Sequence, residues 1–249
     1  MSSAVASYGL FLIVLLRLAV DARAKDRSLI TRRVILLLLT AILVVPVVDY
    51  GSIVPSLAAL ALVILTDAAI LRSMKNRNLA RTVSTSAVTV LTLLLLRDVR
   101  IVGGVSPIIE SIRGFIVAGQ PVGAARNGLD GDVFLFAAGA LIAGFEANHP
   151  VAYVLEKLKL GPAAPYDQHQ LFAAKDVGRG RAIGILERLI VFGLVVTGNA
   201  IAVMFVMTAK AFTRFRELDS REFAEYVLIG TLMSVGLAAL LGAVFGFVL

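Results

Sequence analysis

The sequence contains no cysteine, and this absence limits its chemistry. Disulfides, thiolate metal sites and cysteine nucleophiles are excluded, while the redox compartment stays open. Charge is also scarce, because only 16% of the residues are charged, and they gather between long apolar runs. The N-terminus lacks the basic segment and the cleavage site of a secretory signal peptide. We therefore expect its first apolar run to be retained.

Familiar catalytic patterns are missing as well. The glycines near residue 180 are not followed by G-K-[ST], and G-x-S-x-G is absent. His149 and His169 lie near carboxylates, but their spacing matches no helical metal motif. We expect no metal site and no cofactor, and we find no readable set of catalytic residues. The sequence leaves enzymatic activity uncertain and favours a protein that is not an enzyme.

The chain is instead rich in apolar residues, at 59% of the sequence with a mean hydropathy of +0.91. Soluble domains are usually about 45–50% apolar. Runs such as "VILLLLTAILVVPVV" do not alternate as transmembrane strands do. The composition therefore predicts an all-α, polytopic transmembrane helical bundle. The net charge of +7 is interpreted as membrane topology and attraction to anionic lipids, not as nucleic-acid binding.

About seven spans are expected, within a range of six to eight, since a bilayer core needs roughly 20 helical residues. They fall near 5–20, 34–48, 53–71, 82–96, 132–146, 183–208 and 223–248. Segment 105–119 is interpreted as interfacial or re-entrant, with an eighth span as the alternative. Basic loops at 21–33 and 72–81 predict a multi-pass protein of the cell membrane, with the N-terminus outside.

Composition divides the chain into three regions of one integrated membrane domain. Residues 1–96 form an N-terminal four-helix transmembrane region, and residues 97–182 form a loop-rich middle region with one span at about 132–146. Residues 183–249 form a C-terminal region of two helices. No internal repeat is found.

Charge inside the sixth expected span marks one candidate site. Glu187 and Arg188 lie one turn inside an apolar run, where charge is expensive. If residues 183–208 form one helix, these two share a face with a small and polar patch consisting of Gly184, Gly198, Asn199 and Ala202. This face is either an ordinary packing surface, with each charge paired to a neighbour, or a polar site. Either way, Glu187 needs a basic partner, which we expect to be Arg181 or a residue near the last span.

Basic residues flank the same span. Arg179 and Arg181 lie at its start in "KDVGRGR", where free N–H groups and the helix dipole favour an anion. A protein carboxylate such as Asp176 is the alternative partner. Lys210 and Arg214 share a face at the other end, where side chains often extend to lipid headgroups. Glu225 opens the last span.

Two further polar features lie in the N-terminal region. A hydroxyl stripe on the fourth span is expected to face the bundle interior, and consists of Thr82, Thr85, Ser86, Thr89 and Thr92. Its hydroxyls either bond to their own helix or line a polar path. Arg17 and Asp67, near the ends of two spans, are either headgroup-level residues or a buried pair.

The C-terminal third resembles an uncharacterised family of bacterial and archaeal polytopic membrane proteins. The shared pattern reads G-R-x-I-G-x-L-E-R, then A-I-G-F, A-K-S, R-F and A-E-Y-x-L-I-G-T. It is carried here by residues within Gly180 to Arg188, by Ala200, Ile201, Ala209, Lys210, Arg214 and Phe215, and by residues within Ala224 to Thr231, with Ala202 and Ala211 as departures. The resemblance covers about 55 residues and names no chemistry. It implies that the motif residues form one unit.

Three functions remain open. The first is binding or transport of an anionic lipid or small anion, through Arg179, Arg181, Arg188, Lys210 and Arg214, with Glu187 and Glu225 organising them. The second is a structural or assembly subunit that contacts copies of itself or another membrane protein. The third is a membrane enzyme acting on a lipid-linked phosphate, which ranks last because no paired carboxylates accompany Glu187.

Overall fold

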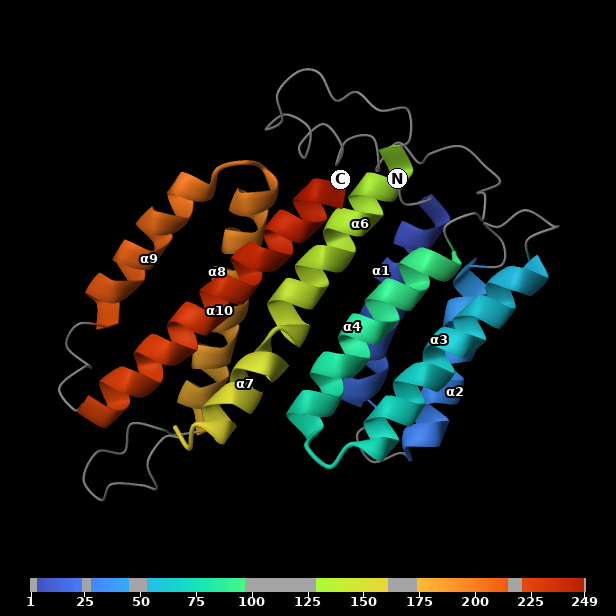
Figure 1. Cartoon of the computed structure of the whole chain (residues 1–249), viewed down its shortest axis with the longest axis horizontal. Helices are drawn as coiled ribbons and strands as arrows, with labels where there is room; N and C mark the ends of the chain where they lie inside the picture. The colour runs from blue at the N-terminus through green and yellow to red at the C-terminus, as the bar shows by residue number, and fades with distance from the viewer. Residues whose placement is uncertain are drawn as a thin grey trace. The chain divides into compact units, whose positions relative to one another are not determined.

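The protein is described here by a computed structural model covering residues 4–23, 28–44, 53–96, 129–160, 174–214 and 221–248. These residues are helical apart from short connections, and no strand occurs among them, which confirms the all-α prediction (Figure 1). The chain divides into two compact units. One comprises residues 1–142 with 247–249, and the other comprises residues 143–246.

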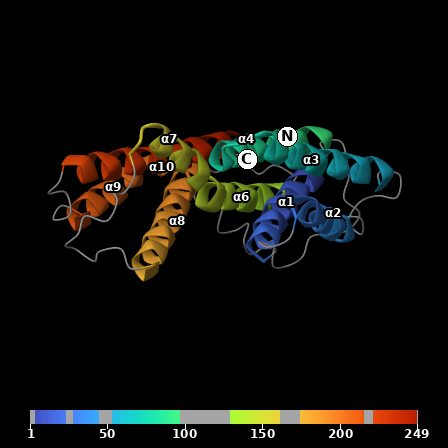
Figure 2. The same ribbon diagram turned by 90° about the horizontal axis from the view of Figure 1, so that it is seen from below.

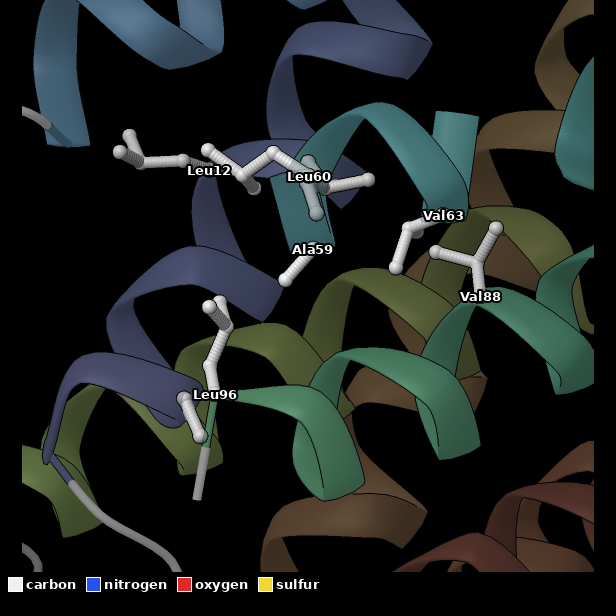
Figure 3. Close-up of a cluster of buried hydrophobic side chains, with 8 residues drawn as sticks. Leu12, Ala59, Leu60, Val63, Val88 and Leu96 are labelled. Atoms are coloured by element: carbon white, nitrogen blue, oxygen red, sulfur yellow. The ribbon is translucent and has the colours of Figure 1, made fainter. Parts of the chain in front are cut away.

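The first unit is built from five described helices in two layers. They are α1 (Ala4–Arg23), α2 (Leu29–Val44), α3 (Ile53–Ser73), α4 (Arg77–Leu95) and α6 (Leu129–Leu141). Figure 2 shows α3 and α4 side by side in one layer, with α2, α1 and α6 in the other. An apolar core joins the layers, because Leu12 of α1 belongs to the same buried cluster as Leu60 of α3 and Val88 of α4 (Figure 3).

Two of these helices begin earlier than the apolar runs predict. Ser28 caps α2, since its hydroxyl accepts from the Thr31 N–H at 3.2 Å. Asn76 caps α4, with Oδ1 accepting from the N–H groups of residues 78 and 79 at 3.0 Å each. The expected loops 21–33 and 72–81 are therefore largely helical. Arg32 and Arg33 lie in the first two turns of α2, and Arg77 and Arg81 lie in those of α4.

The second unit begins within a π-helical turn. This turn, η3 (Ile142–Glu146), continues α6 and is followed by α7 (Asn148–Lys157), α8 (Ala174–Val196), α9 (Ala200–Arg214) and α10 (Arg221–Val248). The expected fifth span at 132–146 thus consists of two consecutive elements, α6 and η3. Gly144 permits the close approach of α8, because a Cβ there would lie 3.1 Å from Leu189.

The expected single span 183–208 is wrong, because the chain reverses at Gly198. Gly198 has a φ of +76°, and its N–H donates to Val195 O at 3.0 Å. The Asn199 N–H donates to Leu194 O at 2.7 Å. These are the two bonds of a Schellman helix ending, for which glycine is the favoured residue. Helices α8 and α9 therefore form an antiparallel hairpin, and the shared face proposed for Gly184, Gly198, Asn199 and Ala202 does not exist.

Helices α8 and α10 run parallel. Arg188 contacts Ser234, and further along Val195 contacts Gly242 and Val196 contacts Gly246. A Cβ on Gly242 would lie 2.9 Å from the Val195 Cβ, so this crossing requires glycine. Gly242 therefore lets α8 and α10 pack closely.

Three of the described helices are long and apolar enough to cross a membrane. They are Ile53–Ser73, Arg77–Leu95 and Glu225–Val248, while Ala200–Phe212 is apolar but shorter. These helices support a membrane protein, although they do not support the expected count of seven spans. Segment 105–119 lies outside the described residues.

Candidate functional site

A network of charged side chains lies inside the first unit, at the end of the unit where α3 turns into α4. Its members come from four helices: Arg17 and Asp21 of α1, Arg32 and Arg33 of α2, Asp67 of α3 and Arg81 of α4. We call these six residues the arginine–aspartate network. Helical spacing assembles it in part, because Arg17 and Asp21 are four residues apart and share a face of α1.

Asp67 is the buried centre of the network. Arg17 Nη2 lies 3.4 Å from Asp67 Oδ1, and Arg33 Nε lies 2.7 Å from Oδ2, although that N–H is not aligned as a hydrogen bond. Ser84 of α4 donates its hydroxyl to Oδ1. The alternative of a buried Arg17–Asp67 pair is confirmed, and a second arginine joins it.

Asp21 forms the outer part of the network. Arg33 reaches it with both terminal nitrogens, Nη1 to Oδ1 at 3.1 Å and Nη2 to Oδ2 at 3.4 Å. Arg81 forms an ion pair with Oδ2, and Arg32 Nη1 lies 4.0 Å from Oδ1. Because Arg33 contacts both carboxylates, it links the inner and outer parts into one system.

Burial decreases outward along the network. The side chains of Arg17 and Asp67 are each 2% exposed, whereas that of Arg32 is 22% exposed. Burial alone would raise the pKa of Asp21, but the adjacent guanidinium groups of Arg33 and Arg81 outweigh it and lower that pKa. Asp21 therefore carries its negative charge at neutral pH.

The network holds more positive than negative charge. Four guanidinium groups face two carboxylates, so these six residues have a formal charge of +2. Removing charges from water is costly, and a buried pair offsets this cost only with good geometry and further hydrogen bonds. An arrangement of this sign favours a guest anion near its exposed end.

Arg188 occupies the interior of the second unit. Its Nη2 donates to Gly144 O at 2.7 Å, its Nε to Ala143 O at 3.0 Å, and its Nη1 to Ser234 Oγ at 3.2 Å. A π-helical turn displaces carbonyls from the regular α-helical pattern. Arg188 binds two of the carbonyls in this turn and ties them to α10. The interpretation of Arg188 as a charge that joins helices fits these contacts.

Glu187 forms an ion pair with Lys210 across the α8–α9 hairpin, and both side chains are 16% exposed. The expectation that Glu187 has a basic partner is confirmed, but the partner comes from α9 instead of the last span. Ser234 lies near the middle of the apolar helix Glu225–Val248. Arg188 and the Glu187–Lys210 pair are thus level with the middle of that helix.

The other residues of the expected C-terminal site are described only in part. The side chains of Arg179, Arg181, Asp176 and Arg214 lie outside the described residues. Glu225 is exposed near the start of α10. Asn199, expected on a polar helix face, lies exposed in the hairpin turn, where its side-chain amide donates to Thr197 O at 3.3 Å.

The hydroxyl stripe of α4 faces inward in part. Thr85 and Thr92 are buried, Thr82 and Thr89 are half-buried, and Ser86 is exposed. The hydroxyls of Thr82, Ser86 and Thr89 bond to carbonyls one turn earlier in α4. The prediction is confirmed for Thr85 and Thr92 and is wrong for Ser86.

Sequence reasoning missed four members of the network and one hydroxyl. It counted Arg32, Arg33 and Arg81 only as loop charges, and it overlooked Asp21 and Ser84. A useful signal was the cap at Ser28, which extends α2 and places Arg32 and Arg33 on its first turns.

Comparison with known proteins adds no neighbour, because no family model, curated protein or solved structure matches the chain.

Proposed function

We propose that this protein is a multi-pass membrane protein that binds an anionic group at the arginine–aspartate network. The group is the phosphate of a lipid headgroup or a small free anion, which share the chemistry that guanidinium groups recognise. The formal charge of +2 over six interacting residues carries the proposal. This site replaces the C-terminal motif as the first candidate, since Glu187 and Arg188 have partners within their own unit.

The exposed end of the network is the expected contact point. Arg32 and Arg81 are its most exposed members, with side chains 22% and 17% exposed. Both lie in the first two turns of their helices, where the helix dipole adds positive potential. Arg17, Arg33 and Asp67 lie deeper and hold the helices in register.

Orientation and family membership belong to the same proposal. The basic ends of α2 and α4 are placed on the cytoplasmic side by the excess of lysine and arginine there, and the N-terminus is placed outside. The resemblance of the C-terminal third to a family of polytopic membrane proteins supports a membrane location. An assembly role, with a second copy or another membrane protein, is the alternative for the second unit, where Arg188 and Glu187 serve helix packing.

The test is a titration of the purified protein in neutral-lipid nanodiscs. Inorganic phosphate is added in one arm, and an anionic phospholipid is included in the other, with binding followed by native mass spectrometry. The double variant Arg32→Gln with Arg81→Gln should weaken binding at least tenfold, because a hydrogen bond to a charged group contributes about 1.5–3 kcal/mol. The arm that shows binding identifies the source of the anion.

A matched control comes from the connection between α3 and α4, which precedes Arg81. Arg72 and Arg77 are exposed and lie outside the network. Their double replacement by glutamine removes the same charge and should leave binding within about twofold. Equal losses in both double variants, or no binding in either arm, would overturn the proposal.

A further inference from the structure

Two polar stripes continue from the arginine–aspartate network into the core between α3 and α4. On α3, Ser56 and Asp67 are eleven residues apart, which is three helical turns and therefore one face. On α4, Arg81 and Thr92 are also eleven residues apart, and Thr85 lies about one turn after Arg81, so these three residues share a face. Ser84 and Thr85 extend the network inward, since Ser84 bonds to Asp67 and both hydroxyl side chains are buried.

The stripes end in two buried hydroxyls that lack hydrogen-bond partners among the described residues. Ser56 is 1% exposed and Thr92 is 0% exposed, and neither Ser56 Oγ nor Thr92 Oγ1 is bonded. Other hydroxyls of the unit, such as those of Thr40 and Thr66, bond to their own helix. A buried unbonded hydroxyl costs free energy, so these two are candidates to bind a guest.

Both hydroxyls lie at the same end of the unit. The Ser84–Asp67 contact fixes the antiparallel register of α3 and α4, and it places Thr92 about one helical turn from Ser56 along the axis. Ser56 is also in the first turn of α3, where backbone N–H groups lack intrahelical partners and the dipole is positive. This end therefore also favours negative charge.

An apolar layer separates the two ends. Leu60, Val63 and Val88 are 0%, 1% and 1% exposed and belong to one buried cluster (Figure 3). Along their helices, Leu60 and Val63 lie between Ser56 and Asp67, and Val88 lies between Ser84 and Thr92. Ser56 and Asp67 are about 16 Å apart along α3 at a rise of 1.5 Å per residue. An apolar constriction of this kind closes a polar path by excluding water.

We infer that the first unit contains a closed path for a small inorganic anion, which runs from the arginine–aspartate network past Leu60, Val63 and Val88 to Ser56 and Thr92. The inference rests on the proposed function and selects the small anion over the lipid headgroup. The arginines repel cations at one end. Hydroxyl and N–H donors replace part of the hydration shell of the anion at the other. A lipid phosphate carries acyl chains and does not fit this core.

The test measures chloride efflux from phosphatidylcholine vesicles that are loaded with potassium chloride and contain the full-length protein. Valinomycin carries potassium out of the vesicles as the counter-ion. Val88→Thr keeps the side-chain volume and adds a donor to the apolar layer. The new hydroxyl can donate a charge-assisted hydrogen bond to the anion and so lower the free-energy barrier to its passage through the apolar layer. The efflux rate should therefore rise by roughly tenfold or more over the wild type. Val63→Thr is a second variant with the same expected effect, in case the first does not fold.

The hydroxyl pair is tested on the opened background. Adding Ser56→Ala and Thr92→Val to Val88→Thr should return efflux to near the wild-type rate. Adding Ser86→Ala, an exposed hydroxyl of the same helix, should leave it raised. Efflux equal to that of protein-free vesicles in both folded threonine variants would overturn the inference. If those variants show no efflux but still bind phosphate, the proposed function stands without the path. If the wild type binds neither phosphate nor anionic phospholipid, both the path and the proposed function are overturned.

Discussion

Arg188 illustrates how one side chain can stabilise an irregular helix. Three of its nitrogens bind two carbonyls of the π-helical turn and the hydroxyl of Ser234. The π turn and the guanidinium depend on each other, because carbonyls buried without donors are costly. A lysine offers a single point charge and cannot supply the same planar set of donors.

Replacing Arg188 with methionine should therefore destabilise the second unit. The loss should be about 1–3 kcal/mol for each carbonyl left unsatisfied. Thermal unfolding in detergent measures it, and Ser234→Ala should cost less, because it removes one partner and leaves both carbonyls bonded. Arg72→Met, at an exposed position, is the control and should change stability by no more than about 0.5 kcal/mol. Similar unfolding temperatures for the variants at 188 and 72 would contradict this role.

Asp21 makes the stability of the first unit depend on pH. Its pKa is lowered in the folded protein by Arg33 and Arg81, which outweigh the effect of burial. The stabilisation is therefore present above the unfolded pKa of about 3.9 and is lost as the pH falls through the lower folded value. Asp21→Asn should lower the unfolding temperature at pH 7 and make it less sensitive to acid. Parallel pH profiles for the variant and the wild type would contradict the prediction.

At the scale of elements, the α8–α9 hairpin changes the expected path of the chain. Helices α8 and α10 run parallel, so they begin at the same end of the second unit. Helix α9, which connects them along the chain, runs in the opposite direction. The hairpin turn is level with the far end of α10, where Val196 contacts Gly246. Alone, α9 is about 22 Å long and shorter than a 30 Å bilayer core.

Cysteine labelling can test this arrangement directly, since the natural chain has no cysteine. Ala174 is the first residue of α8, and position 220 directly precedes α10 in the sequence. Single cysteines at Ala174 and Ser220 should react with an impermeant maleimide from the same side of the membrane. A cysteine at Asn199, in the hairpin turn, should react from the opposite side. Labelling of positions 174 and 220 from opposite sides would instead support one unbroken span.

The elements that could be predicted are those whose sequence is uniform. Helix α3 and the apolar part of α10 match their expected spans closely, because long apolar runs define both ends. The break at Gly198 was hidden because Thr197, Gly198 and Asn199 interrupt the hydropathy too briefly to end a span. Starts of α2 and α4 were misplaced because their first turns are charged, and only the caps at Ser28 and Asn76 reveal them.

The candidate site was predictable only where charge lies inside an apolar run. Arg17 and Asp67 stand out in this way, and so does Glu187. Arg33 and Arg81 sit among other basic residues, and their contacts with Asp21 depend on the three-dimensional meeting of four helices. Lys210 could not be matched to Glu187 without the hairpin.

At the scale of the whole molecule, each of the two units keeps charge in its interior. Among the described residues of the first unit, four interacting arginines meet two aspartates, whereas in the second unit Arg188 binds backbone carbonyls and Glu187 pairs with Lys210. This difference is why we propose the guest anion for the first unit and a packing role for the second. Three described helices meet the length and apolarity of a span, and they occur in both units.

The contacts of Arg188 also set an order for biogenesis. Arg188 follows Gly144 by 44 residues, so the carbonyls of the π-helical turn leave the ribosome well before their donor. At about 5–20 residues per second, this delay is roughly 2–9 s. During that time these carbonyls lack the guanidinium that binds them in the folded protein. The contacts of the π-helical turn with Arg188 can therefore form only after this part of α8 has been synthesised.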